Sequence, residues 1–405
     1  MKFCLVNLGC KVNRVESDSL IATFLGLGHA CVSVRDADYI VVNTCTVTGE
    51  AEKKTRKAVR RALRENATAS VFVTGCAAAL DAQTFEAFDA RVVVEPDKRY
   101  LVETIIQCFG GGANMPVVPA GPEGAYAQRV GKEFPTRVGI KIQDGCDEVC
   151  SYCIVPAARG KARSVSAHEI ETEVLACEAA GVKELVLTGI NLGSYCFEGM
   201  NFTALLKRLL EASEHLRFRI SSIEPCDVDK GLIDLLATSQ GRVCRHLHLP
   251  LQSGSTKVLG EMNRPYDAQA FLEKVAILYE RVPTLALSTD VIVGFPGESE
   301  ADFEQTLALV EHSRFSKVHV FPYSKRAHTP AAKRSDQVDP IVKNERVARL
   351  SALADALRSA DYERRRGTSE AVLVETKGQG MSESYHRIKV PADAIPGSLI
   401  TLTLP

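Results

Sequence analysis

The sequence predicts an α/β protein with three parts: an N-terminal doubly wound parallel-sheet domain, a central partial (βα)6 barrel and a short C-terminal all-β appendage. Short apolar runs alternate with helical patterns near the N-terminus, which is typical of βαβ units. The alternation returns with greater regularity after residue 136, and only short β-like runs follow residue 367. We therefore expect domains at 1–112, 136–366 and 367–405, with a linker at 113–135.

The first domain is expected to hold a parallel sheet. Strands that alternate with helices along a chain pair in parallel, because each helix carries the chain back to the start of the next strand. The expected strands are Phe3–Leu8, Tyr39–Asn43, Val71–Thr74 and Val92–Val94, and the expected helices are Glu16–Leu27, Glu50–Glu65 and Asp81–Phe88.

The second domain is expected to be an open barrel. A stretch rich in glycine and proline precedes it, and that composition is typical of a linker. Six βα steps fall short of the eight of a closed barrel, so a lateral cleft is expected, wide enough for a large substrate. The expected strands are Val138–Ile142, Leu185–Thr188, Phe218–Ile223, Leu247–Leu251, Leu285–Val293 and Val318–Pro322, separated by helices Ala167–Ala180, Phe202–Ser213, Lys230–Ser239, Ala268–Tyr279 and Glu300–Glu311.

The end of the chain combines a long helix with short strands. An amphipathic pattern over Lys343–Arg366 predicts one helix, and Gly367 is a plausible stop for it. Turn residues then separate three β-like runs, which predicts a small all-β unit. The runs are Ala371–Glu375, Tyr385–Val390 and Leu399–Leu404, and the turn residues are Gly378, Gly380, Pro391, Pro396 and Gly397.

Composition narrows the class of protein. A net charge of -1 argues against a globally basic nucleic-acid binder but allows a local basic patch. No apolar run approaches the roughly 20 residues that cross a bilayer, and the apolar stretch in Met1–Cys10 is too short for a signal peptide. We expect a cytoplasmic monomer with no membrane association. Thirteen cysteines in a reducing compartment then favour metal or redox chemistry over disulfides.

Three cysteines form a C-x3-C-x2-C motif at the end of the first barrel strand. They are Cys146, Cys150 and Cys153, and the carboxyl ends of barrel strands are where loops carry active sites. Three thiolates on one loop can bind three irons of a cubane cluster and leave the fourth iron open to a small molecule. The alternatives are a structural zinc site completed by a distant histidine, or plain buried thiols.

Three further cysteines each follow an N-terminal strand. They are Cys10, Cys45 and Cys76, and the carboxyl ends of parallel strands meet at one edge of a sheet, where such folds bind ligands. A second three-thiolate site is therefore expected, and the alternative is that these small apolar residues only end strands. The other seven cysteines are expected to serve packing: Cys4, Cys31, Cys108, Cys177, Cys196, Cys226 and Cys244.

The C-x3-C-x2-C motif, with Tyr152 before its last cysteine and on the first strand of a six-step barrel, resembles the radical SAM superfamily. The resemblance implies a 4Fe-4S cluster whose open iron binds S-adenosylmethionine, and reduction then yields a 5′-deoxyadenosyl radical that abstracts hydrogen from a substrate. It also implies a set of residues that contact S-adenosylmethionine, among which Gly294 allows the backbone to approach the adenine closely. The alternative is that these residues shape loops or cap strands. These residues are Tyr152, Gly189, Asn191, Glu224, His248, Gln252, Ser253, Gly294 and Pro296.

The two triads together resemble the methylthiotransferases, a radical SAM family with a second cluster in an N-terminal domain. Further matching strings are Asn7–Asn13, Asn43–Val47, Thr74–Cys76, Val155–Gly160, His246–Ser255 and Thr289–Glu298. Four strings are most similar to the branch that acts on threonylcarbamoyladenosine in tRNA: Gly9–Asn13, Lys141–Cys146, Leu187–Asn191 and Ser221–Pro225.

The family resemblance implies that a methylthio group is added to carbon 2 of N6-threonylcarbamoyladenosine at position 37, beside the anticodon. It implies two S-adenosylmethionine molecules, two 4Fe-4S clusters, a tRNA partner and an electron donor such as flavodoxin or ferredoxin. No catalytic residue is identified beyond the cluster ligands. The alternatives are the same chemistry on isopentenyladenosine or on a ribosomal-protein aspartate, a non-catalytic iron-sulfur RNA-binding protein, or a zinc-binding structural protein.

Two regions are candidates for RNA contact. The tail Glu370–Pro405 resembles the RNA-binding TRAM domain, with Met381–Val390 matching its central strand. Its roughly 36 residues are short for five strands of about 5–6 residues each, so it is expected mainly to cover the barrel. A basic stripe on the helix after Cys45 is expected to contact phosphates, and the alternative is a solvated charged face. The stripe is Lys53, Lys57, Arg60, Arg61 and Arg64.

Overall fold

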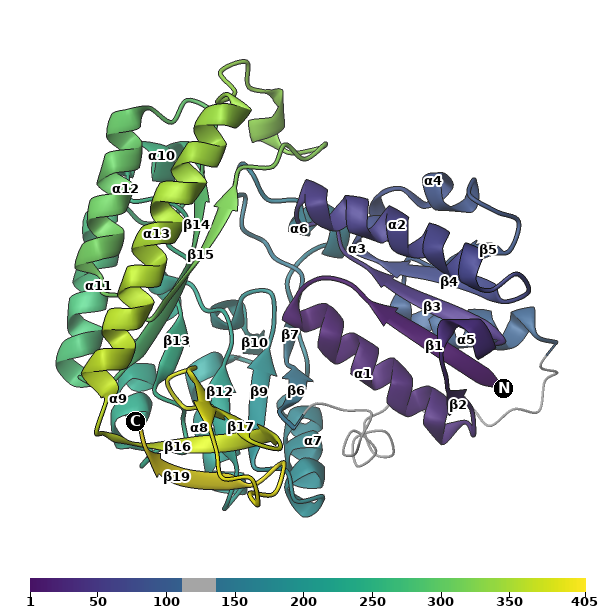
Figure 1. The fold of residues 1–405 in the computed structure, drawn as a ribbon, viewed down its shortest axis with the longest axis horizontal. Helices are drawn as coiled ribbons and strands as arrows, with labels where there is room; N and C mark the ends of the chain where they lie inside the picture. Colours follow the sequence, from purple (N-terminus) through teal and green to yellow (C-terminus); the bar gives the residue numbers. More distant parts are fainter. Residues whose placement is uncertain (111–135) are drawn as a thin grey trace.

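The computed structural model describes residues 1–110 and 136–405, and the expected linker 113–135 lies outside them. It confirms the α/β fold class. A parallel sheet near the N-terminus lies beside a larger curved sheet, and a C-terminal antiparallel sheet lies against one end of the larger one (Figure 1). In the part of the chain that is described, no helix is both long and apolar enough to cross a bilayer. The domain boundaries at 112, 135 and 366 stay a prediction.

The N-terminal sheet has five parallel strands in the order β2-β1-β3-β4-β5. Alternate residues of its central strands face opposite sides, so Ile40 and Val42 pack under α2 while Tyr39 and Val41 pack under α1 and α5. The elements are β1 (Lys2–Asn7), α1 (Lys11–Gly26), β2 (Ala30–Cys31), η1 (Val34–Asp36), β3 (Tyr39–Thr44), α2 (Gly49–Glu65), β4 (Ser70–Gly75), α3 (Cys76–Leu80), α4 (Ala82–Glu86), β5 (Val92–Val94) and α5 (Lys98–Cys108).

Helix α1 begins five residues earlier than the sequence pattern indicates, at Lys11 rather than Glu16. Its first turns bury Asn13, whose side-chain amide donates to the carbonyls of Leu8 and Thr44 at 2.8 Å each. A polar residue in such a buried position hides the apolar periodicity by which a helix is recognised. The pattern also missed α3, α5 and the two-residue strand β2.

The larger sheet is a partial barrel of six parallel strands. Two three-stranded sheets, β6-β9-β12 and β13-β14-β15, are joined by bridges from Phe218 to Val243 and from Ser222 to His248. Strands β6 and β15 share no ladder in the described residues, so the barrel is open between them. The strands are β6 (Val138–Lys141), β9 (Glu184–Thr188), β12 (Arg217–Ile220), β13 (His246–His248), β14 (Ala286–Val293) and β15 (Lys317–Pro322).

Helices cover the outer face of the barrel, and small elements decorate its ends (Figure 1). The helices are α6 (Val155–Arg159), α7 (Ala167–Ala179), α8 (Phe202–Ala212), α9 (Lys230–Thr238), α10 (Thr256–Glu261), α11 (Ala268–Arg281), α12 (Glu300–His312) and α13 (Pro340–Arg365), and the small elements are β7 (Gln143–Asp144), β8 (Arg163–Ser164), η2 (Leu192–Ser194), β10 (Cys196–Phe197), β11 (Met200–Asn201), η3 (Pro225–Asp227) and η4 (Pro330–Lys333).

The C-terminal appendage is a four-stranded antiparallel sheet in the order β18-β17-β16-β19. Gly380 was expected in a turn but lies inside β17, and the single strand expected at Tyr385–Val390 is wrong at its start. Tyr385 has φ +71°, a left-handed conformation that interrupts a strand. The strands are β16 (Ser369–Thr376), β17 (Gln379–Ser382), β18 (Arg387–Lys389) and β19 (Leu399–Thr403).

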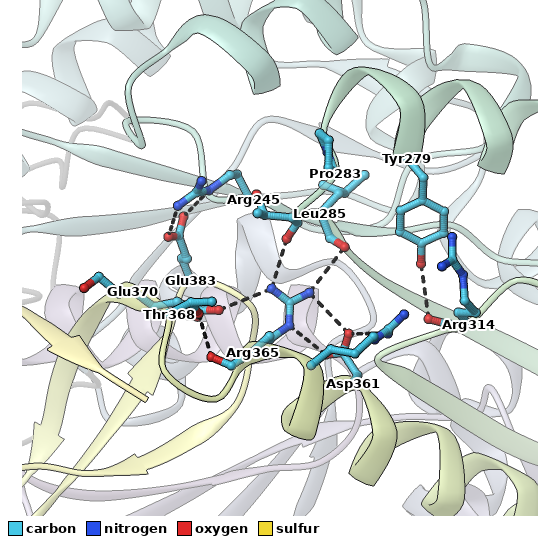
Figure 2. A pocket seen from close by; sticks show the side chains of 13 residues that line it. Arg245, Tyr279, Pro283, Leu285, Arg314, Asp361, Arg365, Thr368, Glu370 and Glu383 are labelled. Carbon is cyan, nitrogen blue, oxygen red and sulfur yellow. Dashed lines mark hydrogen bonds and ion pairs between the residues drawn. The ribbon is translucent and has the colours of Figure 1, made fainter. Parts of the chain in front are cut away.

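Ion pairs attach this appendage to the barrel. In Figure 2 the guanidinium of Arg365, at the end of α13, lies between Asp361, Glu370 and the backbone carbonyl of Leu285. Asp361 also accepts from His386, at 2.8 Å. The cavity of about 330 Å³ beside these groups is lined by charges that pair with one another. These pairs support the expectation that the appendage covers one end of the barrel.

Candidate active site

The register of the N-terminal sheet brings Cys10, Cys45 and Cys76 to one edge. Thr44 of β3 pairs with Gly75 of β4, so the cysteines that follow them are level with each other. Cys10 is the N-cap of α1, just beyond β1, which is the other neighbour of β3. The order of the strands reverses between β1 and β3, and such switch points are where open α/β sheets bind ligands. The strand-end argument from the sequence therefore agrees with the fold.

Gly9 allows this close approach. A Cβ at this position would lie 2.5 Å from the Cβ of Cys45, and the φ of Gly9 is +107°. Only glycine satisfies both conditions. Burial raises the pKa of the Cys45 and Cys76 thiols; the charges of Cys10 and Cys76 raise the former further, and Arg159 lowers both. The three thiols thus lie within electrostatic reach of one another.

The barrel triad lies on the loop after β7, where hydrogen bonds point at each sulfur. The backbone N–H groups of Glu148 and Val155 donate to Cys146 Sγ and Cys153 Sγ, both at 3.4 Å. Arg264 donates to Cys150 Sγ at 3.3 Å. Burial raises the pKa of the Cys153 thiol to about 12, with a further contribution from the charges of the other two cysteines. Bound iron removes such thiol protons, and hydrogen bonds to the sulfur tune the site.

The barrel triad has a donor set that suits an iron-sulfur cluster. It offers three thiols on one loop, and an N–H group donates to each sulfur. A cubane cluster takes each such thiolate on a different iron. In residues 1–110 and 136–405, no group of three or more His, Cys, Asp or Glu side chains forms a site for a single metal ion.

A cavity of about 170 Å³ lies beside Cys153 of the barrel triad and is also lined by residues that follow Cys45. Cys153 and Tyr152 line it from the barrel loop, while Val47 and Thr48, which closely follow Cys45, line it from the N-terminal sheet. A molecule in this cavity would touch the surroundings of both triads. The remaining lining residues are Ile154, Val155, Gln252, Asp290, Ile292, Phe321, Pro322, Tyr323 and Ser324.

Four of the residues expected to contact S-adenosylmethionine lie near the cavity or the barrel lumen. Tyr152 and Gln252 line the cavity, and Gln252 has φ +66°. Glu224 forms an ion pair with Arg264 beside Cys150. His248 Nε2 lies 3.3 Å from Asp290, which also lines the cavity.

Others of the expected contact residues have structural partners. The Asn191 side chain caps η2 and donates to Asp227 at 3.1 Å, while the Ser253 hydroxyl is 3.3 Å from Thr306 of α12. A Cβ at Gly189 would touch Gln143, which accepts hydrogen bonds from the backbone N–H groups of Ile190 and Asn191.

Gly294 and Pro296 lie in the loop that follows β14. A Cβ at Gly294 would lie 2.3 Å from Cγ of Lys343, and the φ of Gly294 is +71°. Contact with α13 and the backbone conformation therefore both require glycine here. Pro296 is buried in the same loop. Contact of either residue with S-adenosylmethionine stays a prediction.

Arg264 is a site residue that the sequence analysis missed. It donates to Glu224, to Cys150 and, at 2.8 Å, to the Tyr266 hydroxyl. Burial raises the pKa of Glu224, which Arg264 lowers in turn. Arg264 lies in a loop without periodicity, and its partners are about 40 and 114 residues away, so no local pattern identifies it.

Arg159 links the segments that carry the two triads and was also missed, although it lies within the matching string Val155–Gly160. It donates to Glu16 of α1 at 3.0 Å, to Asp144 before the barrel triad at 2.9 Å and to Asn13 at 2.6 Å. Burial favours protonation of Glu16, but Lys141, Lys98 and Arg159 outweigh it and hold its pKa well below its usual range. This network fixes the N-terminal sheet against the barrel.

Replacing Arg159 by glutamine is expected to lower the free energy of unfolding by about 1–3 kcal/mol, the cost of a lost charge-assisted hydrogen bond. The loss is moderate because Glu16 keeps Lys98 and Lys141 as partners. Chemical denaturation measures it, and hydrogen exchange should rise in α1. Arg14→Gln is the control, since Arg14 is half exposed and, within the described residues, its ion pair is with Asp18. Equal stability of the two variants would contradict the proposed linking role.

The expected basic stripe lies on α2, and all of its members are exposed. Arg61 pairs with Glu65 at 2.7 Å, and the guanidinium of Arg60 lies 4.6 Å from the ring centre of Phe88. The other members have no ion pair in the described residues. Those members are Lys53, Lys57 and Arg64.

Two protein-family models match this chain, and each of them spans one of the two cysteine triads. Residues 140–310 match the radical SAM superfamily, and residues 2–94 match uncharacterized protein family UPF0004. The chain is 40% identical to the threonylcarbamoyladenosine tRNA methylthiotransferase MtaB of Bacillus subtilis over 86% of this chain and 79% of that protein. It is 34% identical to a tRNA-2-methylthio-N(6)-dimethylallyladenosine synthase of Desulfosudis oleivorans, over 97% of this chain and 86% of that protein.

A solved structure shares the fold. The radical S-adenosylmethionine methyltransferase TsrM from Kitasatospora setae superimposes with a TM-score of 0.58 at 14% identity, over 82% of this chain and 77% of that one. The radical SAM fold implies a 4Fe-4S cluster and S-adenosylmethionine, which the barrel triad fits. The chain is therefore an enzyme of the radical SAM methylthiotransferase family and belongs to its threonylcarbamoyladenosine tRNA methylthiotransferase (MtaB-like) branch.

Proposed function

We propose that this tRNA methylthiotransferase adds a methylthio group to carbon 2 of N6-threonylcarbamoyladenosine at position 37, using two S-adenosylmethionine molecules and two 4Fe-4S clusters. The observation that carries the proposal is the cavity that Cys153 of one incomplete thiol triad lines together with Val47 and Thr48, which closely follow Cys45 of the other. Sulfur transfer to an unreactive carbon needs a radical source and a sulfur source near the same atom. The name of the Bacillus subtilis relative supports the choice of nucleoside.

The residues of the chain have separate tasks in this proposal. Cys146, Cys150 and Cys153 hold the first cluster, and Cys10, Cys45 and Cys76 hold the second. When bound, the first cluster and S-adenosylmethionine would supply a radical that activates carbon 2, and the second cluster would supply the methylated sulfur.

The surrounding groups position and shield the reactants. Arg264 fixes Glu224 beside Cys150, and Tyr152 closes the apolar side of the cavity. Arg159 holds the two triads at a constant separation. Enclosure excludes water, which protects a radical from side reactions.

The tRNA is expected to lie across α2. Its exposed stripe supplies cations for phosphate contacts, which position an RNA without reading its sequence. We propose that the C-terminal sheet covers the barrel rather than binding tRNA alone, since two of its glutamates, Glu370 and Glu383, form ion pairs with arginines outside the sheet. A flavodoxin or ferredoxin is the proposed electron donor, and a monomer is the proposed state.

Nucleoside mass spectrometry of tRNA from cells with and without the gene tests the function. Loss of the gene should remove 2-methylthio-N6-threonylcarbamoyladenosine. Its precursor, which lacks the methylthio group, should accumulate by the amount of product that is lost. If that nucleoside persists while the methylthio form of isopentenyladenosine vanishes, the substrate is wrong and the chemistry stands. If both persist, the substrate is not one of these tRNA nucleosides, and the ribosomal-protein aspartate becomes the next candidate.

A further inference from the structure

Tyr385 closes the floor of the barrel lumen. It projects from the loop between β17 and β18, and its ring stacks on His246 of β13 with centroids 4.9 Å apart. Four cations from separate parts of the chain surround this ring. Their distances to the ring centre are 5.4 Å for Lys11, 5.4 Å for Arg137, 5.0 Å for Arg219 and 5.9 Å for Lys317.

The positive charge at this floor exceeds the negative charge. Arg219 is neutralised by Glu184 at 2.7 Å and Arg137 by Glu375 at 2.7 Å. Lys11 and Lys317 make no ion pair in the described part of the chain. Two ammonium groups, those of Lys11 and Lys317, therefore face the Tyr385 ring without forming an ion pair among the described residues.

Two neighbouring groups respond to this surplus. Burial would raise the pKa of Tyr385, but Lys11, Arg137 and Arg219 outweigh burial and lower it to about 8. The pKa of Lys317 is lowered by burial and then by repulsion from Arg358 and Lys11. Nearby positive charge favours the anionic form of Tyr385 and disfavours the cationic form of Lys317. The same positive charge would attract an anionic ligand.

The lumen also contains a carboxylate and histidines, and these are engaged with each other. Asp290 lies 3.3 Å from His248, whose other ring nitrogen is 3.0 Å from the Ser288 hydroxyl. His319 is kept neutral, since burial and then Lys317 lower its pKa to about 4. Burial raises the pKa of Asp290, but His248 first, and then His319 and Lys11, outweigh burial and lower it. Asp290 is therefore held mainly by His248, its hydrogen-bonded neighbour.

There is room for a ligand group beside Lys317. A cavity of about 680 Å³ is lined by Lys317 and Tyr385, and Lys11 approaches the same Tyr385 ring without lining the cavity. Its other cationic lining residues are Arg137, Arg358 and Arg387, and its carboxylates are Asp355 and Glu363.

On the basis of the proposed function, we propose that Lys11 and Lys317 bind the threonyl carboxylate of the substrate nucleoside and so select it over apolar N6 substituents. Lys11 directly follows Cys10, so this subsite begins one residue from a proposed cluster ligand. Carbon 2 and the N6 group share one edge of the purine, with only N1 and C6 between them. With carbon 2 at the cavity beside Cys153, the proposal has the N6 substituent extend along the barrel lumen towards Lys11 and Lys317.

The positive charge of Lys11 and Lys317 explains why an anionic N6 substituent would be preferred over an apolar one. A carboxylate gains charge-assisted hydrogen bonds from the two ammonium groups. A dimethylallyl group would leave both of them desolvated and unpaired, and sites built for a polar group reject analogues that lack it.

The test measures equilibrium binding of the reconstituted holoenzyme to synthetic anticodon stem-loops. One loop carries threonylcarbamoyladenosine at position 37 and the other carries its neutral methyl ester. The native chain should bind the acid about tenfold more tightly than the ester, the size of one charge-assisted hydrogen bond. Lys11→Gln and Lys317→Gln should each abolish most of this preference, Lys11→Arg should keep most of it, and Lys207→Gln, at an exposed site on α8, should leave it unchanged.

Iron content and visible absorption of each variant show that the clusters are retained. Variants that keep the native preference for the acid would overturn the inference, as would variants that lose affinity for acid and ester equally, which indicates contact with a phosphate. A native enzyme that methylthiolates the acid loop yet binds both loops equally overturns this inference alone. A native enzyme that methylthiolates only a dimethylallyladenosine loop overturns the proposed function and this inference together.

Discussion

Replacing Cys45 by alanine should stop methylthio transfer and leave reductive cleavage of S-adenosylmethionine measurable, whereas replacing Cys150 should abolish both. The two thiols belong to different triads, and residues close to each triad line one cavity, Cys153 from the barrel loop and Val47 and Thr48 from the segment after Cys45. Cys150 receives a hydrogen bond from Arg264 within the barrel triad, and Cys45 is buried at the edge of the N-terminal sheet beside Gly9. Loss of one ligand therefore disables one site and leaves the other intact.

Both activities can be measured in the same reaction. Mass spectrometry of 5′-deoxyadenosine reports cleavage, and mass spectrometry of digested tRNA reports the methylthio product. Cys196→Ala is the control, because Cys196 is an exposed thiol in the β10–β11 hairpin, and both of its activities should match those of the native enzyme. Normal transfer by Cys45→Ala would show that the N-terminal triad is not the sulfur site.

The thiol sites illustrate what can be predicted from sequence. Cys45 and Cys76 each follow an apolar run, and parallel pairing of adjacent strands is enough to place them side by side. No side-chain contact is needed for that inference. Six strands and their helices follow from periodicity in the same way, which is why their bounds in the structure differ by only a few residues.

The residues that the sequence did not reveal act through partners far away in the chain. Arg264 reaches Cys150 and Glu224, and Arg159 reaches Glu16, across 40 to 143 residues. The apolar pattern predicts Tyr385 as a strand residue, yet its left-handed backbone interrupts the sheet and its ring stacks on His246 of the barrel. Local patterns carry no information on such contacts, because long-range partners depend on how the elements pack.

Replacing Glu184 by glutamine should lower the free energy of unfolding by about 3–5 kcal/mol, the cost of breaking a buried ion pair. Glu184 is fully buried in β9 and accepts from Arg217 at 2.9 Å and from Arg219 at 2.7 Å. In the expected strand around Phe218 these arginines alternate with apolar residues, which suggests a solvent-facing side. The variant would leave two buried guanidinium groups without a counter-charge.

The same arginines attach the C-terminal sheet, so the effect should extend there. Arg217 donates to the carbonyl of Ala371 at 2.9 Å, and Arg219 donates to the carbonyls of Glu383 and Ser382 at 2.9 and 3.1 Å. Hydrogen exchange should therefore rise in β16 and β17 of the variant. Chemical denaturation of the reconstituted protein gives the stability change.

The penalty of the Glu184 variant should depend on pH. Burial would raise the pKa of Glu184, but Arg219 and Arg217 outweigh it and lower the pKa from 4.5 to about 2. A folded-state pKa below the unfolded one gives stability that is present above about 4.5 and lost as the pH falls towards 2. The difference in free energy of unfolding between the native and Glu184→Gln chains should therefore shrink over that window.

Glu211→Gln is the matched control, since this exposed glutamate lies 3.9 Å from Lys207. This substitution should change the free energy of unfolding by no more than about 0.5 kcal/mol. A Glu184→Gln chain as stable as the Glu211→Gln chain at neutral pH would mean that the buried arginines do not depend on this carboxylate.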